Sequence, residues 1–323
     1  MDILELTFRV SGVTTNIILP PLISLVISFF TSMGGISGAF IILPYQMSVL
    51  NYTAPSVSGT NHVFNIVAIP SGVHRYIKEG RMAWPLTWVV IAGTLPGVFI
   101  GYYLRVLYLP DPKTFKLFVG CVLLYIGIRL FKDLFGGKND RSAGARVLEE
   151  KFKARAFEMR KEHHEMIAAG LPADAVVRTI SVSLQKVEYE FWGERFSFNT
   201  LGMFALAFAV GIIGGAYGIG GGAIIAPFCV AFFQLPVYTI AGATLTGTLI
   251  TSVAGALFFS VLPATHGVSP MPDWPLGVLF GVGGFVGMYL GAKTQKYMPQ
   301  KFIKIFVGTA IIFLAIKYIS QYL

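Results

Sequence analysis

Two glycine-rich segments interrupt hydrophobic stretches of this sequence and are its first candidates for chemistry. One runs from Met33 to Gly38 and the other from Tyr217 to Gly222. A helix that is broken inside a membrane exposes backbone groups, which are tolerated only where protein or a watery cavity surrounds them. The helix that begins after the break points its N–H groups and the positive end of its dipole toward the break. Two such breaks could hold one oxyanion, although glycines also serve simply to let membrane helices pack closely.

Polar side chains inside hydrophobic spans form a second group of candidates. They comprise Ser56, Ser58, Thr60, Asn61, His62 and Asn65 in the first half, Thr244, Thr246, Thr248, Thr251 and Ser252 in the second, and Gln46 and Gln234. A polar side chain at such a depth either bonds a neighbouring helix or lines a hydrated path, and we favour the path. From both groups, the predicted substrate contacts are Gly35, Ser37, Gly38, Gln46, Thr60, Asn61, His62, Asn65, Gly218, Gly220, Gly221, Gly222, Gln234, Thr244, Thr246 and Thr248.

His62 is the one histidine well inside a hydrophobic span. Its ring could donate a hydrogen bond to a bound anion, or it could titrate and couple transport to protons. The alternative is a neutral histidine that bonds an adjacent helix. We treat His62 as the candidate for proton coupling, because an ionisable residue inside a membrane is a functional hypothesis by default.

Acidic residues are missing from the hydrophobic segments. Glu79, Asp111 and Asp273 are all predicted to lie in loops. Cation sites usually need carboxylates, so the pattern disfavours a metal transporter and favours an anion held by N–H, hydroxyl, amide and imidazole donors. Arg105 and Arg129 lie near span ends, where we expect them to extend to the interface as anchors, with steering of anions as the alternative.

Enzymatic motifs find no support in this sequence. It contains no HExxH pair, no paired membrane aspartates and no nucleophile elbow, so neither an enzyme, a cofactor nor a metal site is predicted. Adjacent histidines on a helix point about 100° apart, so the segment from Glu162 to Glu165 is interpreted as a solvated charged face rather than a metal site. Cys121 and Cys229 lie in apolar runs and are interpreted as packing residues.

The elements that position these candidates are membrane helices. Hydrophobic residues make up 54% of the chain and charged residues 13%, with a mean hydropathy of +0.68, and several apolar runs approach the roughly 20 residues that a helix needs to cross a bilayer. We predict an all-α polytopic membrane protein whose first span directs insertion without a removable signal peptide. The predicted apolar segments are 16–32, 38–50, 56–76, 86–107, 115–131, 200–213, 222–234, 238–262, 275–294 and 302–321.

The two halves of the chain resemble each other. The segment from Gly35 to Pro44 aligns without gaps on that from Gly218 to Pro227, with six of ten positions identical, and Trp84-Pro85-Leu86 later aligns on Trp274-Pro275-Leu276. This order predicts a duplicated membrane fold with repeats at 1–131 and 200–323. About ten segments give an odd number per half, so the repeats should be inverted, with broken or re-entrant helices at the glycine-rich segments.

Charge distribution predicts how the chain lies in its membrane. The net charge of +9 is spread over span ends and one loop rather than gathered on one face, which argues against a nucleic-acid partner. Positive residues in the loop from Arg75 to Arg81 should mark the cytoplasmic side, with both termini external. Residues 132–199 should form a soluble, cytoplasmic insert, with a helix over 148–163 and either a short strand pair or a helix over 179–198.

The repeated segments GISGAFIILP and GIGGGAIIAP, with Gly59-Thr60-Asn61 and Gly80-Arg81-Met82-Ala83-Trp84, resemble the sulfite exporter (TauE/SafE) family, also called the toluene sulfonate uptake permease family. The resemblance covers both membrane halves. It implies a transporter of sulfite, sulfoacetate or another organosulfonate, often directed outward, and it adds Gly59 to the substrate surroundings. The chain differs from the family in its Ser37-Gly38-Ala39 segment and in the length of its insert.

The predicted function is therefore a secondary anion exporter that works by alternating access between two repeats. Its partners are a small anionic substrate and the lipid bilayer of a prokaryotic cytoplasmic membrane. A homo-oligomer and a protein partner for the insert stay open. The alternative is a membrane scaffold or sensor that signals through the charged insert.

Overall fold

The computed structural model describes residues 4–33, 35–135, 147, 150, 176–262, 269–294 and 300–321, and these are mainly helical. Four helices in these ranges are long and apolar enough to cross a membrane: Trp84–Tyr108, Thr200–Tyr217, Tyr238–Val261 and Trp274–Thr294. The prediction of a mostly helical membrane protein is confirmed at this level. Apart from residue 150, the predicted helix over 148–163 and the segment from Glu162 to Glu165 lie outside the described residues.

The helices of the first half are α1 (Leu19–Met33), α2 (Ala39–Ser48), α3 (Ser56–Lys78), α4 (Trp84–Tyr103) with the π-helical turn η1 (Leu104–Tyr108), and α5 (Pro112–Phe135). Those of the second half are α7 (Thr200–Tyr217), α8 (Gly222–Ala231), α9 (Val237–Val261), α10 (Trp274–Thr294) and α11 (Gln300–Ser320). Both α4 and α10 begin at a Trp-Pro pair. Proline suits the first turn of a helix, because it has no N–H and the N–H groups of that turn have no partner within the helix.

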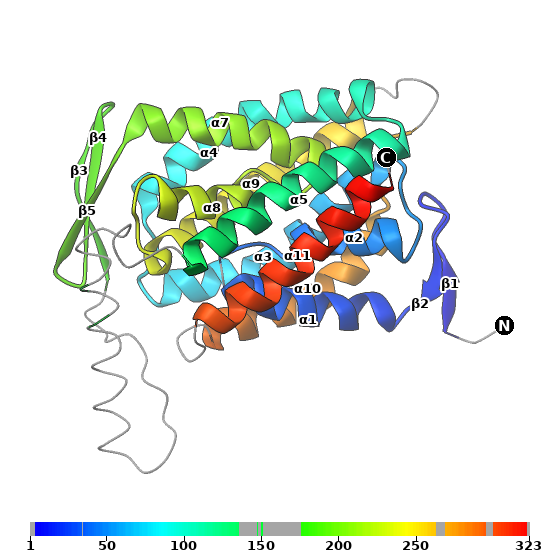
Figure 1. Ribbon diagram of the computed structural model, residues 1–323, viewed down its shortest axis with the longest axis horizontal. Coiled ribbons are helices and arrows are strands. Elements are labelled where there is room, and N and C mark those ends of the chain that lie inside the picture. The colour runs from blue at the N-terminus through cyan, green and yellow to red at the C-terminus, as the bar shows by residue number, and fades with distance from the viewer. Residues whose placement is uncertain are drawn as a thin grey trace, which may run out of the picture.

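Helices α1 and α7 run along the long axis of the molecule, and α5 and α11 cross the bundle obliquely (Figure 1). Helix α4 packs against α7 and α9, α1 packs against α10, α3 packs against both α9 and α10, and α5 packs against α11. Glycines at every fourth position allow two of these close contacts: Gly93, Gly97 and Gly101 of α4 lie on the α7 backbone, and Gly283, Gly287 and Gly291 of α10 lie on that of α1. The polar helix α3 is buried among apolar neighbours.

Strands cover both ends of the helical bundle, so the all-α prediction is wrong in this respect. The hairpin of β1 (Glu5–Thr7) and β2 (Thr14–Asn16) lies at one end, and the sheet of β3 (Val177–Val182), β4 (Lys186–Phe191) and β5 (Glu194–Asn199) lies at the other (Figure 1). The sheet is antiparallel in the order β3-β4-β5. The strand alternative for 179–198 is therefore the right one, with three strands rather than two.

The three-stranded sheet is attached to both halves of the bundle. The N–H of Val177 donates to the carbonyl of Gly80 in the α3–α4 loop at 2.9 Å. The hydroxyl of Tyr189 lies 2.9 Å from that of Thr239 on α9. Along β4, Val187, Tyr189 and Phe191 are buried, which is the alternation of a strand with one covered face.

Candidate functional site

Both glycine-rich segments are helix breaks buried inside the bundle. Helix α1 ends at Met33 and α2 begins at Ala39, while α7 ends at Tyr217 and α8 begins at Gly222. We call residues 35–38 the first glycine turn and residues 218–221 the second glycine turn. Gly35, Gly218 and Gly220 have φ values of 71°, 85° and 71°, in the left-handed region where glycine alone is free of strain. The N–H of Gly218 donates to the Gly214 carbonyl at 2.9 Å, which is how a left-handed residue ends a helix.

The two helices that begin after these turns differ in how their first N–H groups are bonded. In α2, the N–H of Ala39 donates to the Ser37 hydroxyl at 3.2 Å. Gly220 occupies the equivalent place before α8 and has no side chain to offer, and the Gly221 N-cap makes no side-chain bond. The positive end of α8 is therefore the less satisfied of the two, which is the property that suits an anion.

Asn65 on α3 joins the two turns. Its side-chain oxygen accepts a short hydrogen bond from the Ser37 hydroxyl of the first turn. Its amide nitrogen donates to the Ile219 carbonyl of the second turn at 3.1 Å and to Ser252 on α9 at 3.0 Å. The side-chain amide of Asn65 thus holds the helix break of the first half next to that of the second half.

Two further residues lie on the same face of α3 as Asn65. The amide of Asn61 donates to the Ala39 carbonyl at 3.0 Å, and the hydroxyl of Ser58 donates to the Ala216 carbonyl at 3.0 Å. Positions 58, 61 and 65 share a face because helical residues three and four apart are neighbours. The polar face of α3 therefore lies against both helix breaks.

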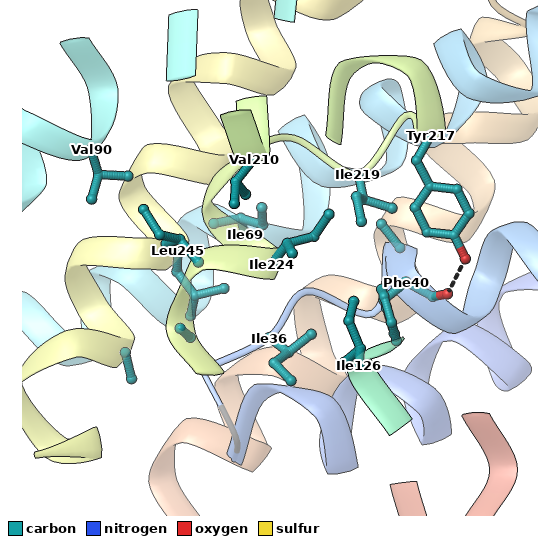
Figure 2. Packing of buried hydrophobic residues seen from close by; sticks show 14 of the residues in the cluster. Ile36, Phe40, Ile69, Val90, Ile126, Val210, Tyr217, Ile219, Ile224 and Leu245 are labelled. Carbon is teal, nitrogen blue, oxygen red and sulfur yellow. Dashed lines mark hydrogen bonds between the residues drawn. The ribbon is translucent and has the colours of Figure 1, made fainter. Parts of the chain in front are cut away.

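Apolar residues of the two turns also share one cluster. Figure 2 shows Ile36 and Ile219 among the same buried side chains, beside Phe40 and Tyr217. The Tyr217 hydroxyl donates to the Phe40 carbonyl at 3.0 Å, and the two rings meet edge to face. Both turns are thus packed on the protein rather than facing lipid.

Most threonines of the predicted polar track are bonded to backbone carbonyls. The hydroxyls of Thr60, Thr246, Thr248 and Thr251 each donate to the carbonyl four residues earlier. The hydroxyl of Thr244 reaches the Gly35 carbonyl at 3.2 Å and so links α9 to the first turn. Four of these hydroxyls thus donate within their own helix, and among the five only that of Thr244 makes the bond to another element that the helix-bonding alternative describes.

Among the uncharged side chains that the structure describes, Ser28, Gln46 and Asn61 (its oxygen) have buried polar atoms without a hydrogen-bond partner. Leaving such a group unbonded costs about 1–3 kcal/mol each, so a ligand or water is expected to meet them. Ser28 was missed by sequence reasoning, since nothing in the sequence separates it from the other hydroxyl residues of α1. It faces the first turn, because a side chain at Gly38 would collide with its hydroxyl.

The ring of His62 lies between the two halves. It packs on Gly255 of α9, where an added Cβ would approach the ring atoms to 2.5–2.7 Å. The Phe259 ring centroid is 5.9 Å away, and the backbone of Gly215 faces the imidazole. His62 is thus enclosed by second-half residues close to the second glycine turn.

Three predicted contacts are not brought to the turns. Gln234 is exposed in the loop after α8. Gly59 lies against Pro272 and Phe259, and the hydroxyl of Thr246 lies 3.8 Å from the Met82 sulfur. The remaining predicted glycines pack closely around the second turn: a Cβ at Gly222 would lie 2.6 Å from the Thr248 hydroxyl, and one at Gly221 2.8 Å from the Thr94 Cβ.

Two charged side chains are buried where the sequence indicated loops or interfaces. Arg105 is completely buried, so its interpretation as an anchor reaching the interface is wrong; Arg129 is half-buried with its guanidinium 4.6 Å above the Phe232 ring. Asp273 does lie just before α10, but its carboxylate is buried and accepts from the N–H and hydroxyl of Ser11 at 2.9 and 2.8 Å. The residues that cover both groups come from distant parts of the chain, which a local pattern does not reveal.

Comparisons with known proteins point to a family of membrane transporters. The family model for the sulfite exporter TauE/SafE matches residues 21–318. A probable membrane transporter protein of Bacillus subtilis, YunE, is 22% identical over 90% of this chain and 92% of its own length. A second, YdhB of the same organism, is 29% identical over 28% of this chain and 35% of its own length. No solved structure matches the chain.

Proposed function

The chain belongs to the sulfite exporter TauE/SafE family of membrane transporters, and from this we propose that it is a secondary transporter that exports a small sulfur-containing anion. Sulfite, sulfoacetate and other organosulfonates are the candidate substrates. The membrane is the cytoplasmic membrane of a prokaryote. The anion binds where the two glycine turns meet.

The observation that carries this proposal is the joining of two buried helix breaks by Asn65. The α8 N-terminus offers backbone donors and a positive dipole end there. The buried carboxylate of Asp273 accepts hydrogen bonds from Ser11 and the N–H of Leu276. The unpartnered hydroxyl of Ser28, beside Gly38, and the unpartnered oxygen of Asn61, whose amide bonds Ala39, supply further polar groups from α1 and α3. Such an arrangement suits an anion better than a cation.

Inverted repeats are supported by reciprocal contacts between the halves. Gly35 packs against Ala241 of α9, and at an offset of 183 residues Gly218 packs against Ser58 of α3, which is the residue equivalent to Ala241. The pairs α4–α7 and α1–α10 correspond in the same way. Since α1 starts beside the β1–β2 hairpin and α7 starts beside the three-stranded sheet, equivalent helices run in opposite directions (Figure 1).

Alternating access follows from this relation. When two inverted halves exchange conformations around a site at their interface, the site opens first to one side of the membrane and then to the other. The contacts of Asn65 and of the Gly218–Ser58 pair cross between the halves, so they must loosen or re-form in each cycle. The glycines permit such sliding because no side chain protrudes.

Binding of the purified protein to its substrate tests the proposal. A ligand that binds the folded state at 100 times its Kd stabilises it by about 2.7 kcal/mol. We expect millimolar sulfite or an organosulfonate to raise the Tm in detergent, chloride at equal ionic strength to leave it unchanged, and the stabilising anion to be exchanged across proteoliposome membranes. Neither selective stabilisation nor exchange would be found for a scaffold or sensor that signals through the insert.

His62 remains the candidate for proton coupling within this proposal. If its imidazole gains and loses a proton during the cycle, His62→Gln should flatten the pH dependence of anion flux in proteoliposomes. An unchanged pH profile at normal flux would assign His62 to packing between α3 and α9.

A further inference from the structure

Arg105 is a buried cation whose contacts are all with neutral groups. It lies in η1, the last turn of the span that α4 begins. Its Nε donates to the Ser58 hydroxyl at 3.3 Å, one terminal nitrogen donates to the Thr53 carbonyl at 3.1 Å and the other to the Leu109 carbonyl. The guanidinium carbon lies 3.6 Å from the centroid of the Phe115 ring. Among the described residues, no carboxylate pairs with it.

Arg81 is a buried arginine of the same protein that has the usual compensation for its charge, an ion pair with a carboxylate. It is equally buried, but it pairs with Glu79, which also pairs with Arg75 at 2.5 Å. A charge removed from water is costly unless an opposite charge and hydrogen bonds compensate it. Carbonyls and an aromatic face compensate only part of the charge of Arg105, so its surroundings carry a net positive potential.

This positive potential lies next to the second glycine turn. Ser58, which accepts from Arg105, donates in turn to the Ala216 carbonyl. The backbone of Gly218 touches that of Ser58 so closely that a Cβ there would lie 2.5 Å from the Ser58 Cα. One serine therefore separates the guanidinium from the turn that begins α8.

The guanidinium also has donors to spare. It carries five N–H groups, and the contacts described above use three of them. A planar fork of N–H donors matches the paired oxygens of a sulfonate or sulfite group, as it matches carboxylates and phosphates. The π-helical geometry of η1 is a local departure from the α-helix of the kind often found at functional sites.

We propose that Arg105 is a substrate-binding residue that supplies the positive charge by which the transporter recognises its anion beside the second glycine turn. This inference rests on the proposed function and adds the residue that makes the transporter selective for a charged substrate. During the cycle an oxygen of the anion replaces one of the carbonyls of Thr53 or Leu109 on the guanidinium. The site should accordingly reject a neutral molecule of the same shape.

Ligand binding to purified variants tests the assignment. The probe is methanesulfonate, measured by isothermal titration in detergent with the wild type, Arg105→Gln, Arg105→Lys and the control Arg129→Gln. Arg129 is matched because it also lies over an aromatic ring near a span end, yet it is only half-buried. Loss of a charge-assisted contact should raise the Kd of Arg105→Gln about 10- to 100-fold, with a smaller increase for Arg105→Lys and none for Arg129→Gln.

The outcomes separate this inference from the proposed function. Wild-type affinity in folded Arg105→Gln would overturn the role of Arg105 while leaving a sulfonate transporter in place, whereas a wild type that neither binds nor exchanges any sulfur-containing anion would overturn both. Competition on the wild type covers the case in which the variants do not fold. Dimethyl sulfone, a neutral analogue, should fail to displace methanesulfonate, and equal displacement would overturn the inference.

Discussion

Replacing Gly218 with alanine should destabilise the second glycine turn through two separable effects. Gly218 has φ 85° and ψ 22°, a left-handed conformation that costs an alanine about 1–2 kcal/mol. The added Cβ would also lie 2.5 Å from the Cα of Ser58 and 2.8 Å from its carbonyl carbon. Both are backbone atoms of α3, which cannot rotate away as a side chain could. Overpacking of this kind costs about 1–3 kcal/mol more.

Gly193 provides the matched control for this substitution. It lies between β4 and β5 with φ 79°, and an added Cβ would meet nothing within 4 Å. Gly193→Ala therefore carries the conformational strain alone, about 1–2 kcal/mol, and Gly218→Ala about 2–5 kcal/mol in total. The difference between the two isolates the contact between the second turn and α3.

Reversible unfolding of both variants in mixed detergent micelles, followed by far-UV circular dichroism, measures the two losses. Anion-dependent stabilisation should also fall in Gly218→Ala and persist in Gly193→Ala, because only the former distorts the start of α8. Equal losses of stability in the two variants would refute the close packing of the turn on α3.

Three further substitutions probe the joints around the site. Asn65→Ala removes three hydrogen bonds and should cost about 3 kcal/mol in the same unfolding assay. The control Ser71→Ala should cost about 1 kcal/mol, because it removes one hydroxyl donor shared by the Ala68 and Phe285 carbonyls; equal costs would contradict the joining role of Asn65. Burial raises the pKa of the Tyr189 hydroxyl, so it stays protonated and keeps its hydrogen bond with Thr239. Tyr189→Phe should therefore speed hydrogen exchange in β4, and unchanged exchange would argue against the attachment of this strand to α9. Asp111→Ala should cost about 1 kcal/mol, because it removes the side chain that caps the N-terminus of α5. The hydrogen bond from the Thr114 N–H lowers the pKa of Asp111 in the folded state, so this stabilisation is fully present above the unfolded pKa of about 3.9 and is lost as the pH falls through the lower folded pKa. The unfolding free energies of wild type and variant should therefore converge in acid.

The helix breaks could be predicted because their causes are local. Glycine in a hydrophobic run marks a stop, and the repeat of the same pattern 183 residues later excludes coincidence. Helix α3 was expected at 56–76 and spans Ser56–Lys78. Helix α10 was expected from residue 275 and begins at Trp274. In each case the boundary depends on residues within one turn of it.

The buried charges could not be predicted because their causes are distant. Whether Arg105 extends outward or turns inward depends on Phe115 of α5 and on the loop at Thr53. The burial of Asp273 depends on a hairpin more than 250 residues earlier in the chain, whose Ser11 donates to it. The partners of the polar face of α3 could not be predicted either. The sequence indicates that these residues lie inside a span, but their hydrogen-bond partners depend on how the two halves pack.

The candidate site is asymmetric although the halves that build it are related. The described uncharged side chains with unpartnered buried atoms, Ser28, Gln46 and Asn61, all come from the first half, and their equivalents at the same offset are Gly211, Cys229 and Thr244. The second half contributes backbone instead, since Gly220 leaves the start of α8 without the hydroxyl that Ser37 gives to α2.

This asymmetry bears on which anion fits. The α8 start and Arg105 suit the negatively charged oxygens of a ligand. The unpartnered oxygen of Asn61 is an acceptor, because the amide nitrogen of Asn61 already donates to the Ala39 carbonyl. It repels a negatively charged oxygen of a ligand and can accept a hydrogen bond from a ligand hydroxyl. A ligand with an oxyanion at one end and a donor at the other satisfies both halves at once. Bisulfite and hydroxysulfonates have that form, whereas sulfoacetate presents acceptors at both ends, so we expect the former to bind more tightly.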